Sequence, residues 1–174
     1  MSILKGYVKC IDIFNERVAK TFAWLTVILM IGMVYSTIMR YLFNKPPLWT
    51  YDFVYYCANV MFMMGAAYVL QIKGNVTIDL FFSKFSQKGQ AIVDTVLSLI
   101  LFFPLFIALF YFSMINVPFS WQAGERAVES VIRVPIYPLK TVIPITCVML
   151  ILQQIAELIR NGFFIVTGKE LRWK

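Results

Sequence analysis

The sequence predicts an all-α integral membrane protein with four transmembrane helices and a short cytoplasmic interfacial helix between the second and the third. Two observations predict this fold class. Hydrophobic residues make up 60% of the 174 residues and charged residues only 14%, against roughly 45–50% and 25% in soluble domains. A soluble domain of this length cannot bury that excess, and the apolar residues fall into four runs of about 20 residues, the length that crosses a bilayer.

The four runs are uncharged at their centres and belong to a single membrane domain, 1–174. Charged residues at the span ends, such as Asp94 and Glu157, are expected to reach the headgroup region. Pro104 and Pro144 fall inside the third and fourth spans, where we expect each to kink or loosen its helix. The predicted spans are approximately 18–39, 51–72, 92–112 and 139–159.

Before the first span, apolar residues recur at helical spacing, which predicts an amphipathic helical extension of that span. Asp12 is expected on a different face of this extension. Contact with the membrane surface and packing on a partner are equally consistent with such a stripe. The stripe consists of Ile3, Tyr7, Ile11, Phe14 and Val18.

The two longer loops predict different structures. Residues 73–90 alternate apolar and polar side chains, which is typical of a short helix lying on the cytoplasmic face. The outer loop, 118–138, carries charges at the i,i+4 spacing of a helix, so they could pair with one another or be presented to a partner outside the membrane. These charges are Glu125, Arg126, Glu129 and Arg133.

The distribution of lysine and arginine predicts the orientation, because cytoplasmic loops are enriched in these residues. Of the 16 in the chain, 11 lie in the N-terminal tail (four), the second loop (three) and the C-terminal tail (four), against two and three in the outer loops. Both termini are therefore expected in the cytoplasm. The net charge of +7 is explained by anchoring to lipid headgroups, and nucleic-acid binding is not expected.

The chain lacks the residues that several classes of function require. The chain has no histidine, so a haem-binding subunit is nearly excluded. No span has a carboxylate at mid-depth, as proton-coupled transport would require. The sequence offers no phosphate-binding loop, metal-ligand pair or activated nucleophile, and its three cysteines are far apart. We expect no catalytic residue, cofactor or metal.

Small residues in the first two spans allow another helix backbone to approach closely. That helix could belong to this chain or to a larger membrane partner, for which such a bundle would be a plausible scaffold. The small residues are Gly32, Ser36, Gly65 and Ala66.

A series of short motifs from Arg40 to Gln154 resembles the small membrane subunit of tripartite ATP-independent periplasmic (TRAP) transporters. The motifs are short, so their order and spacing carry the resemblance. Two positions differ from the family pattern: Asp52 stands where the family often has Glu, and Asn75 where it often has His. The motifs are Arg40–Asn44, Pro47–Asp52, Gly65–Tyr68, Gly74–Asp79, Pro135–Lys140, Ile143-Pro144 and Leu152–Gln154.

The resemblance implies an accessory subunit of a sodium-coupled importer of organic acids in a bacterial inner membrane. Its expected partners are a large multi-span membrane subunit, which would carry the transport site, and a periplasmic solute-binding protein. The four small residues are then candidates for packing on the large subunit, and the four outer-loop charges for docking the binding protein. Two alternatives stay open: a stand-alone homo-oligomeric transporter or channel, and a membrane assembly factor.

Overall fold

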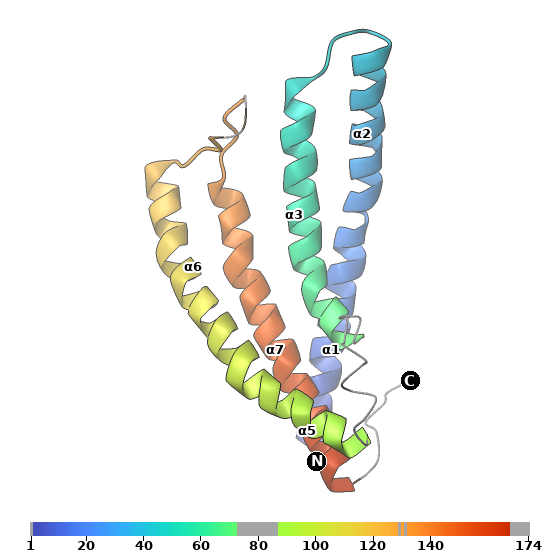
Figure 1. Cartoon of the computed structure of the whole chain (residues 1–174), viewed down its shortest axis with the longest axis vertical. Coiled ribbons are helices and arrows are strands. Elements are labelled where there is room, and N and C mark those ends of the chain that lie inside the picture. Colours follow the sequence, from blue (N-terminus) through green and yellow to red (C-terminus); the bar gives the residue numbers. More distant parts are fainter. Residues whose placement is uncertain (1, 73–86, 129, 131, 168–174) are drawn as a thin grey trace.

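The computed structural model describes residues 2–72, 87–128, 130 and 132–167 (Figure 1). Within this part of the chain, four helical stretches are long and apolar enough to cross a membrane. The predicted all-α fold with four transmembrane helices is thus confirmed. In chain order the elements are α1 (Ser2–Ala23), α2 (Leu25–Tyr41), α3 (Leu48–Gln71), α5 (Gln87–Leu97), the π-helix η1 (Ser98–Phe102), α6 (Phe103–Ala123) and α7 (Tyr137–Thr167).

The first span is longer than its apolar run, because α1 and α2 form one helical stretch interrupted only at Trp24. Two local features end α2 and start α3. Asn44 has a left-handed φ of 53°, a conformation that stops a right-handed helix. Pro46 and Pro47 follow, and Pro47 is extended with ψ 116° immediately before α3 begins.

Pro104 loosens the third span one turn before its own position. A proline cannot donate a backbone hydrogen bond, and its ring crowds the carbonyl four residues earlier. The backbone N–H of Phe103 donates instead to the carbonyl of Ser98, five residues back, within the π-helix η1. The predicted disturbance is therefore present, and it takes the form of a wider turn.

The helices form two pairs around a central contact (Figure 1). The central helices α3 and α7 contact each other, and α1 contacts both, whereas α2 packs mainly on α3 and α6 mainly on α7. Met64 and Ala67 of α3 meet Met149 and Leu150 of α7 in a small buried core. The peripheral helix α2 has no buried residue.

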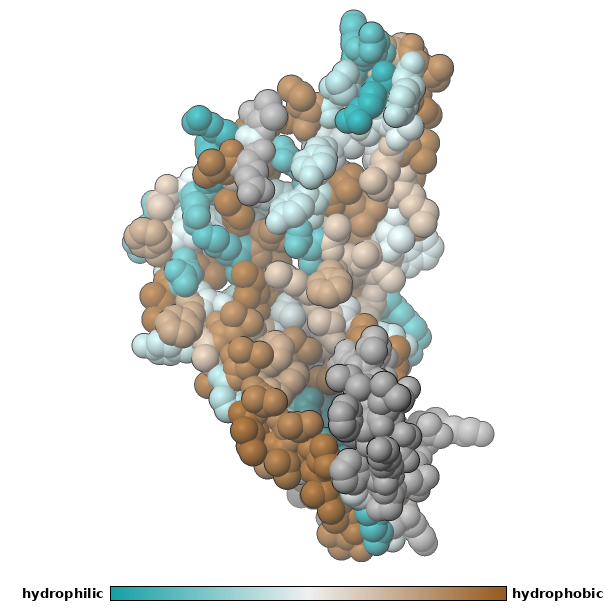
Figure 2. Space-filling view, viewed as in Figure 1, coloured by the Kyte–Doolittle hydropathy of each residue, from teal (hydrophilic) through white to brown (hydrophobic). Residues whose placement is uncertain are grey.

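The two ends of the molecule differ in composition. Helix α1 begins and α7 ends at the end where α3 stops and α5 starts, while the α2–α3 and α6–α7 connections lie at the opposite end (Figure 1). Figure 2 shows hydrophobic residues along the α5–α6 flank and hydrophilic residues gathered near the two connections. The predicted interfacial helix falls on 73–86, outside the described residues, while 87–90 begin α5.

Candidate functional site: the outer loop, the packing faces and a buried polar cluster

The outer loop is held to α6 and α7 by a charged contact. Ser120, near the end of α6, and Lys140, in the first turn of α7, both donate to the Glu125 carboxylate. Gly124 ends α6 with a left-handed φ of 57° and so turns the chain toward this contact. The hydrogen bonds from Lys140 and from Ser120 hold the pKa of Glu125 below its ordinary value.

The same loop is also fastened to α3. Ser130 donates to the Asp52 carboxylate at 2.5 Å, and the Tyr56 hydroxyl donates to the backbone carbonyl of Pro135 at 2.6 Å. Asp52 and Tyr56 lie one turn apart near the start of α3, so both face the loop. The loop therefore joins the α2–α3 pair to the α6–α7 pair at this end of the molecule.

The described charges of the outer loop do not lie along a helix, although their spacing suits one. Arg126 forms an isolated antiparallel bridge with Pro135, and Arg133 has a left-handed φ of 55°, so the loop doubles back instead of coiling. Pro135, two residues before α7 begins, favours extended backbone at the residue before it, which explains why the spacing argument fails here. Glu125 is engaged by Lys140, both Arg126 and Arg133 are exposed, and Glu129 lies outside the described residues.

The four small residues occupy different environments. A Cβ atom at Gly32 would lie 3.7 Å from Val54, so this glycine faces α3 of the same chain. Ala66 packs against the buried core, and Ser36 is half-buried. A Cβ atom at Gly65 would meet nothing within 4 Å. The described part of the chain thus leaves open space beside Gly65.

A buried polar cluster joins α1 to α7, at the end of the molecule away from the outer loop. The Asn15 amide donates to the Gln153 side-chain oxygen at 2.7 Å, and the Gln153 amide donates to Asp12 at 3.2 Å. Arg160 forms ion pairs with both Asp12 and Glu157. Gln153 is 0% exposed and Asn15 1%, so each needs the other as a partner.

This cluster corrects two expectations. Asp12 and Asn15 face inward with Val8 and Ile11, whereas Phe14 of the predicted apolar stripe is 54% exposed. Glu157 does not reach the headgroups but is 5% exposed inside the molecule. Because their polar partners lie on α7, the hydrogen-bonding groups of α1 face inward together with part of the apolar stripe, including Ile11 and Val18. In the sequence, the signal for this contact between α1 and α7 was the presence of complementary polar residues at helical spacing in both helices.

A groove near this cluster was not predicted. It lies between the end of α3, the α5–α6 helix and α7, with a volume of about 410 Å³. Across the helices, the Gln154 amide donates to the Ser98 hydroxyl at 2.5 Å, which ties α7 to the π-helix at the groove wall. Among the described residues, no group of three or more His, Cys, Asp or Glu side chains could hold a metal ion.

One comparison with known proteins is informative. Residues 29–162 match the family model of the DctQ component of tripartite ATP-independent periplasmic transporters. This match includes all of α3, α5, η1 and α6, together with most of α2 and α7. No curated protein matches the chain.

Proposed function

The chain belongs to the DctQ component family of tripartite ATP-independent periplasmic transporters, and from this membership we propose how it serves such a transporter. The family consists of transporter components, not of enzymes, and the chain is the small membrane component. We propose that it is an accessory scaffold. In this role it stabilises the large membrane subunit of a sodium-coupled importer of organic acids and helps to dock the periplasmic binding protein.

The packing of the helices supports the scaffold role. A helix at the edge of a membrane bundle can be covered by lipid or by another protein, and open small residues favour another protein. Helix α2 has no buried residue and α6 buries only Ser113 and Ser120, so both flanks are available. The open space at Gly65 on the central helix α3 is the single observation that favours close approach of a partner helix. Ser36 is a second, half-buried candidate.

The outer loop supports the docking role. Its attachment to three helices fixes the backbone that presents Arg126 and Arg133, and both side chains are exposed. Exposed charges on a rigid surface steer association and set its register. In this proposal Glu125 holds the loop in place and the two arginines meet the binding protein.

The proposal places the chain in a bacterial inner membrane with both termini in the cytoplasm. The excess of lysine and arginine in the tails and the second loop supports this orientation. The outer loop then faces the periplasm, where a soluble binding protein works. Sodium coupling and an organic-acid substrate follow the resemblance to TRAP transporters, and both are assigned to the partners of this chain.

Uptake by reconstituted proteoliposomes tests the proposal. The chain alone should move no organic acid under a sodium gradient, whereas the large subunit and the binding protein should need it for uptake. Gly65→Phe should weaken co-purification of the large subunit, and Gly162→Phe is the matched control, because a Cβ atom there also meets nothing within 4 Å. Transport by the chain alone would favour a stand-alone transporter or channel. The chain would instead be an assembly factor if the large subunit assembles poorly without it, while the large subunit that does assemble takes up solute equally well in its absence.

A further inference from the structure

The outer loop forms a short hairpin with a fixed tip. Its two arms pair where the backbone N–H of Ala127 donates to the carbonyl of Val134 at 2.9 Å. At the tip, the N–H of Arg133 donates to the carbonyl of Ser130 at 3.2 Å and closes a turn. The Ser130 side chain also donates to Asp52 of α3. The tip is therefore held both by its own backbone and by a helix outside the loop.

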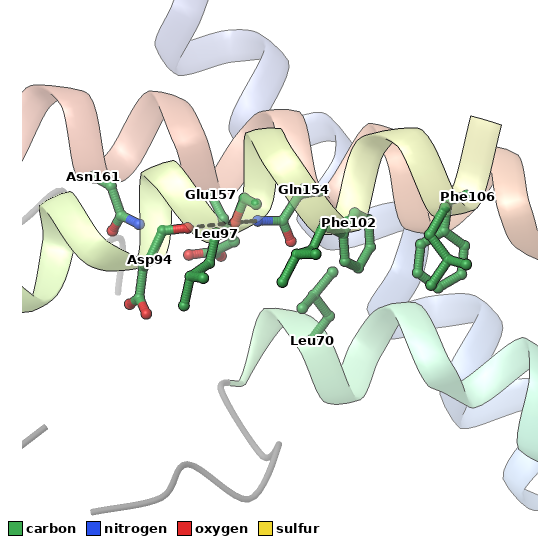
Figure 3. Close-up of a pocket in the computed structure, with 11 residues that line it drawn as sticks. Leu70, Asp94, Leu97, Phe102, Phe106, Gln154, Glu157 and Asn161 are labelled. Atoms are coloured by element: carbon green, nitrogen blue, oxygen red, sulfur yellow. Dashed lines mark hydrogen bonds between the residues drawn. The ribbon is translucent and has the colours of Figure 1, made fainter. Parts of the chain in front are cut away.

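Two apolar side chains project from this tip, because Val128 is 97% exposed and Ile132 48% exposed. Most other exposed apolar residues of the described chain lie on the membrane-spanning helices, where lipid tails can cover them. Leu101 and Leu105 are examples, and both line the groove beside η1 (Figure 3). Val128 and Ile132 lie on a loop instead, so their removal from water needs a different partner.

The place of the hairpin indicates where that partner lies. The loop is fastened to α3 through Asp52 and to α6 and α7 through Glu125, so its attachments reach both helix pairs. The connection between α6 and α7 rises above the ends of both helices (Figure 1), which places the tip over the bundle. In the proposed orientation this end faces the periplasm, where a soluble protein can reach Val128 and Ile132.

The charges of the hairpin indicate the chemistry of the partner surface. Arg126 and Arg133 are exposed, whereas Glu125 is paired with Lys140 at the base of the loop. The described part of the tip thus presents cationic groups beside apolar ones. Such a surface complements carboxylates on the partner. Interfaces commonly place apolar contacts at the centre and charges at the rim.

We propose that Val128 and Ile132 are the apolar anchor of the docking site and enter an apolar pocket, rimmed by carboxylates, on the periplasmic binding protein. Arg126 and Arg133 steer the approach and set its register. The two apolar side chains keep the complex together once water has left the contact. This inference rests on the proposed docking role and adds the residues that determine how long the complex lasts.

Binding of the periplasmic protein to the full membrane complex in nanodiscs, followed by surface plasmon resonance at two salt concentrations, tests this division. Val128→Ser and Ile132→Ser should each raise the dissociation rate about tenfold at both salt concentrations. Arg126→Glu should instead slow association, mainly at low salt. Leu42→Ser is the matched control and should bind unchanged, because Leu42 is 76% exposed on the connection between α2 and α3.

The outcomes separate the anchor from the docking role itself. If Arg126→Glu slows association while Val128→Ser and Ile132→Ser leave dissociation unchanged, the docking role stands and the anchor is rejected. If none of the three variants changes binding, the loop does not dock the binding protein and both proposals fail. An equal loss in Leu42→Ser would also reject the anchor, because any exposed apolar residue at this end would then serve.

A photo-crosslinking residue at position 128 identifies what covers the tip. In the nanodisc complex it should form adducts with the binding protein when that protein is added. Adducts with lipid instead of protein would show that the tip enters the bilayer, and the proposal would be overturned.

Discussion

The two exposed arginines of the outer loop have different backbone conformations. Arg126 is paired with Pro135 in an extended bridge, whereas Arg133 has a φ of 55°, a left-handed conformation that few residues other than glycine, asparagine and aspartate adopt readily. A substitution at 133 therefore changes the backbone preference as well as the charge. Arg133→Asn removes the charge and keeps a residue that tolerates this conformation.

We predict that Arg126→Glu and Arg133→Asn each slow uptake several-fold at low salt and less at high salt. The reason is that a rim charge acts mainly on the association rate, and salt screens it over about 10 Å at 0.1 M. Uptake at two ionic strengths measures the effect, with co-purification of the large subunit as a check on assembly. Lys45→Glu, on the α2–α3 connection, is the matched control for surface charge. Equal rates for all variants at both salt concentrations would remove the docking role.

A further prediction concerns Glu125 and pH. Hydrogen bonds from Lys140 and Ser120 lower the pKa of Glu125 from its ordinary value of 4.5. A carboxyl whose pKa is lower in the folded chain adds stability above its unfolded-state pKa, and this stability is lost as the pH falls through the folded-state value. The wild-type chain should thus unfold at a higher temperature than Glu125→Gln at pH 7, and the gap should shrink as the pH falls below 4.5 and toward the lowered folded-state pKa. A gap that is independent of pH would show that the carboxylate is not the stabilising group.

Charge spacing did not indicate how the charges of the outer loop are arranged. Glu125 and Arg133 fall at spacings that suit a helix, yet the structure pairs Glu125 with Lys140, fifteen residues away. Spacing reports only local contacts, and the partner here comes from the next helix. Ser130 and Asp52, which also contact each other, are even further apart in the sequence. No local pattern indicates this contact.

At the scale of elements, the buried cluster makes α1 part of the bundle instead of a surface extension. Isolated buried polar groups are costly, and paired ones specify how two helices meet. Asn15 and Gln153 are the most deeply buried pair in the cluster. The attachment of α1 to α7 thus depends on polar groups, although most of the molecule is apolar.

Asn15→Leu and Gln153→Met should each lower the free energy of unfolding by about 1–3 kcal/mol, because each leaves a buried partner without its hydrogen bond. The double variant should cost less than the sum of the two single changes, with a coupling of roughly 0.5–3 kcal/mol. Unfolding in a denaturing-detergent titration, followed by tryptophan fluorescence, measures the cycle. Trypsin cleavage at Arg17 reports whether α1 has separated from the bundle.

Asn116→Leu is the control for this cycle. Asn116 is exposed on α6 and donates to the carbonyl of Phe112 in its own helix. The same chemical change should have little effect there. Strict additivity of the Asn15 and Gln153 variants would mean that the two amides do not act together.

Periodicity predicted the helical character of α1 but not its orientation. Ile11 and Val18 of the predicted stripe do face other helices to some degree, whereas Phe14 does not. In a membrane protein an apolar stripe can face lipid as readily as protein, because lipid tails are as apolar as side chains. Polar residues such as Asn15 therefore carry more information about packing than the stripe does.

For the whole molecule, the lengths of the apolar runs predicted the four spans, and the structure has all four. Which helix packs on which was not predictable from these runs. Helix α6, for example, has hydrophobic residues on every face and buries only two serines. With no contrast between faces, its contact with α7 depends on shape and on a few polar groups, such as Trp121, which donates to Thr141.

For the whole molecule, we predict its orientation in the membrane. Helix α1 begins and α7 ends at the same end of the molecule (Figure 1), so both termini should lie on one side. Reporter fusions after Lys174 and within 73–90 should read as cytoplasmic, and fusions at Gly124 as periplasmic, because cationic loops stay inside. A periplasmic reading after Lys174 would reverse the orientation and remove Arg126 from reach of any periplasmic protein.

The π-helix at Ser98–Phe102 also fixes the rotational phase of the third span. A π turn contains one residue more than an α turn, and one residue corresponds to about 100° of rotation around a helix. Ser98, near the start of this span, accepts a hydrogen bond from Gln154 of α7. Trp121, twenty-three residues later, contacts Tyr137 of the same helix. Deleting one residue within Ser98–Phe102 would restore ordinary α-helical winding and leave the phase of the helix after it unchanged, because the wide turn accommodates one extra residue. A deletion further along α6 has no such turn to absorb it and would rotate everything after it by about 100°. The third span should therefore tolerate the loss of a residue at the π-helix far better than the loss of one elsewhere in α6.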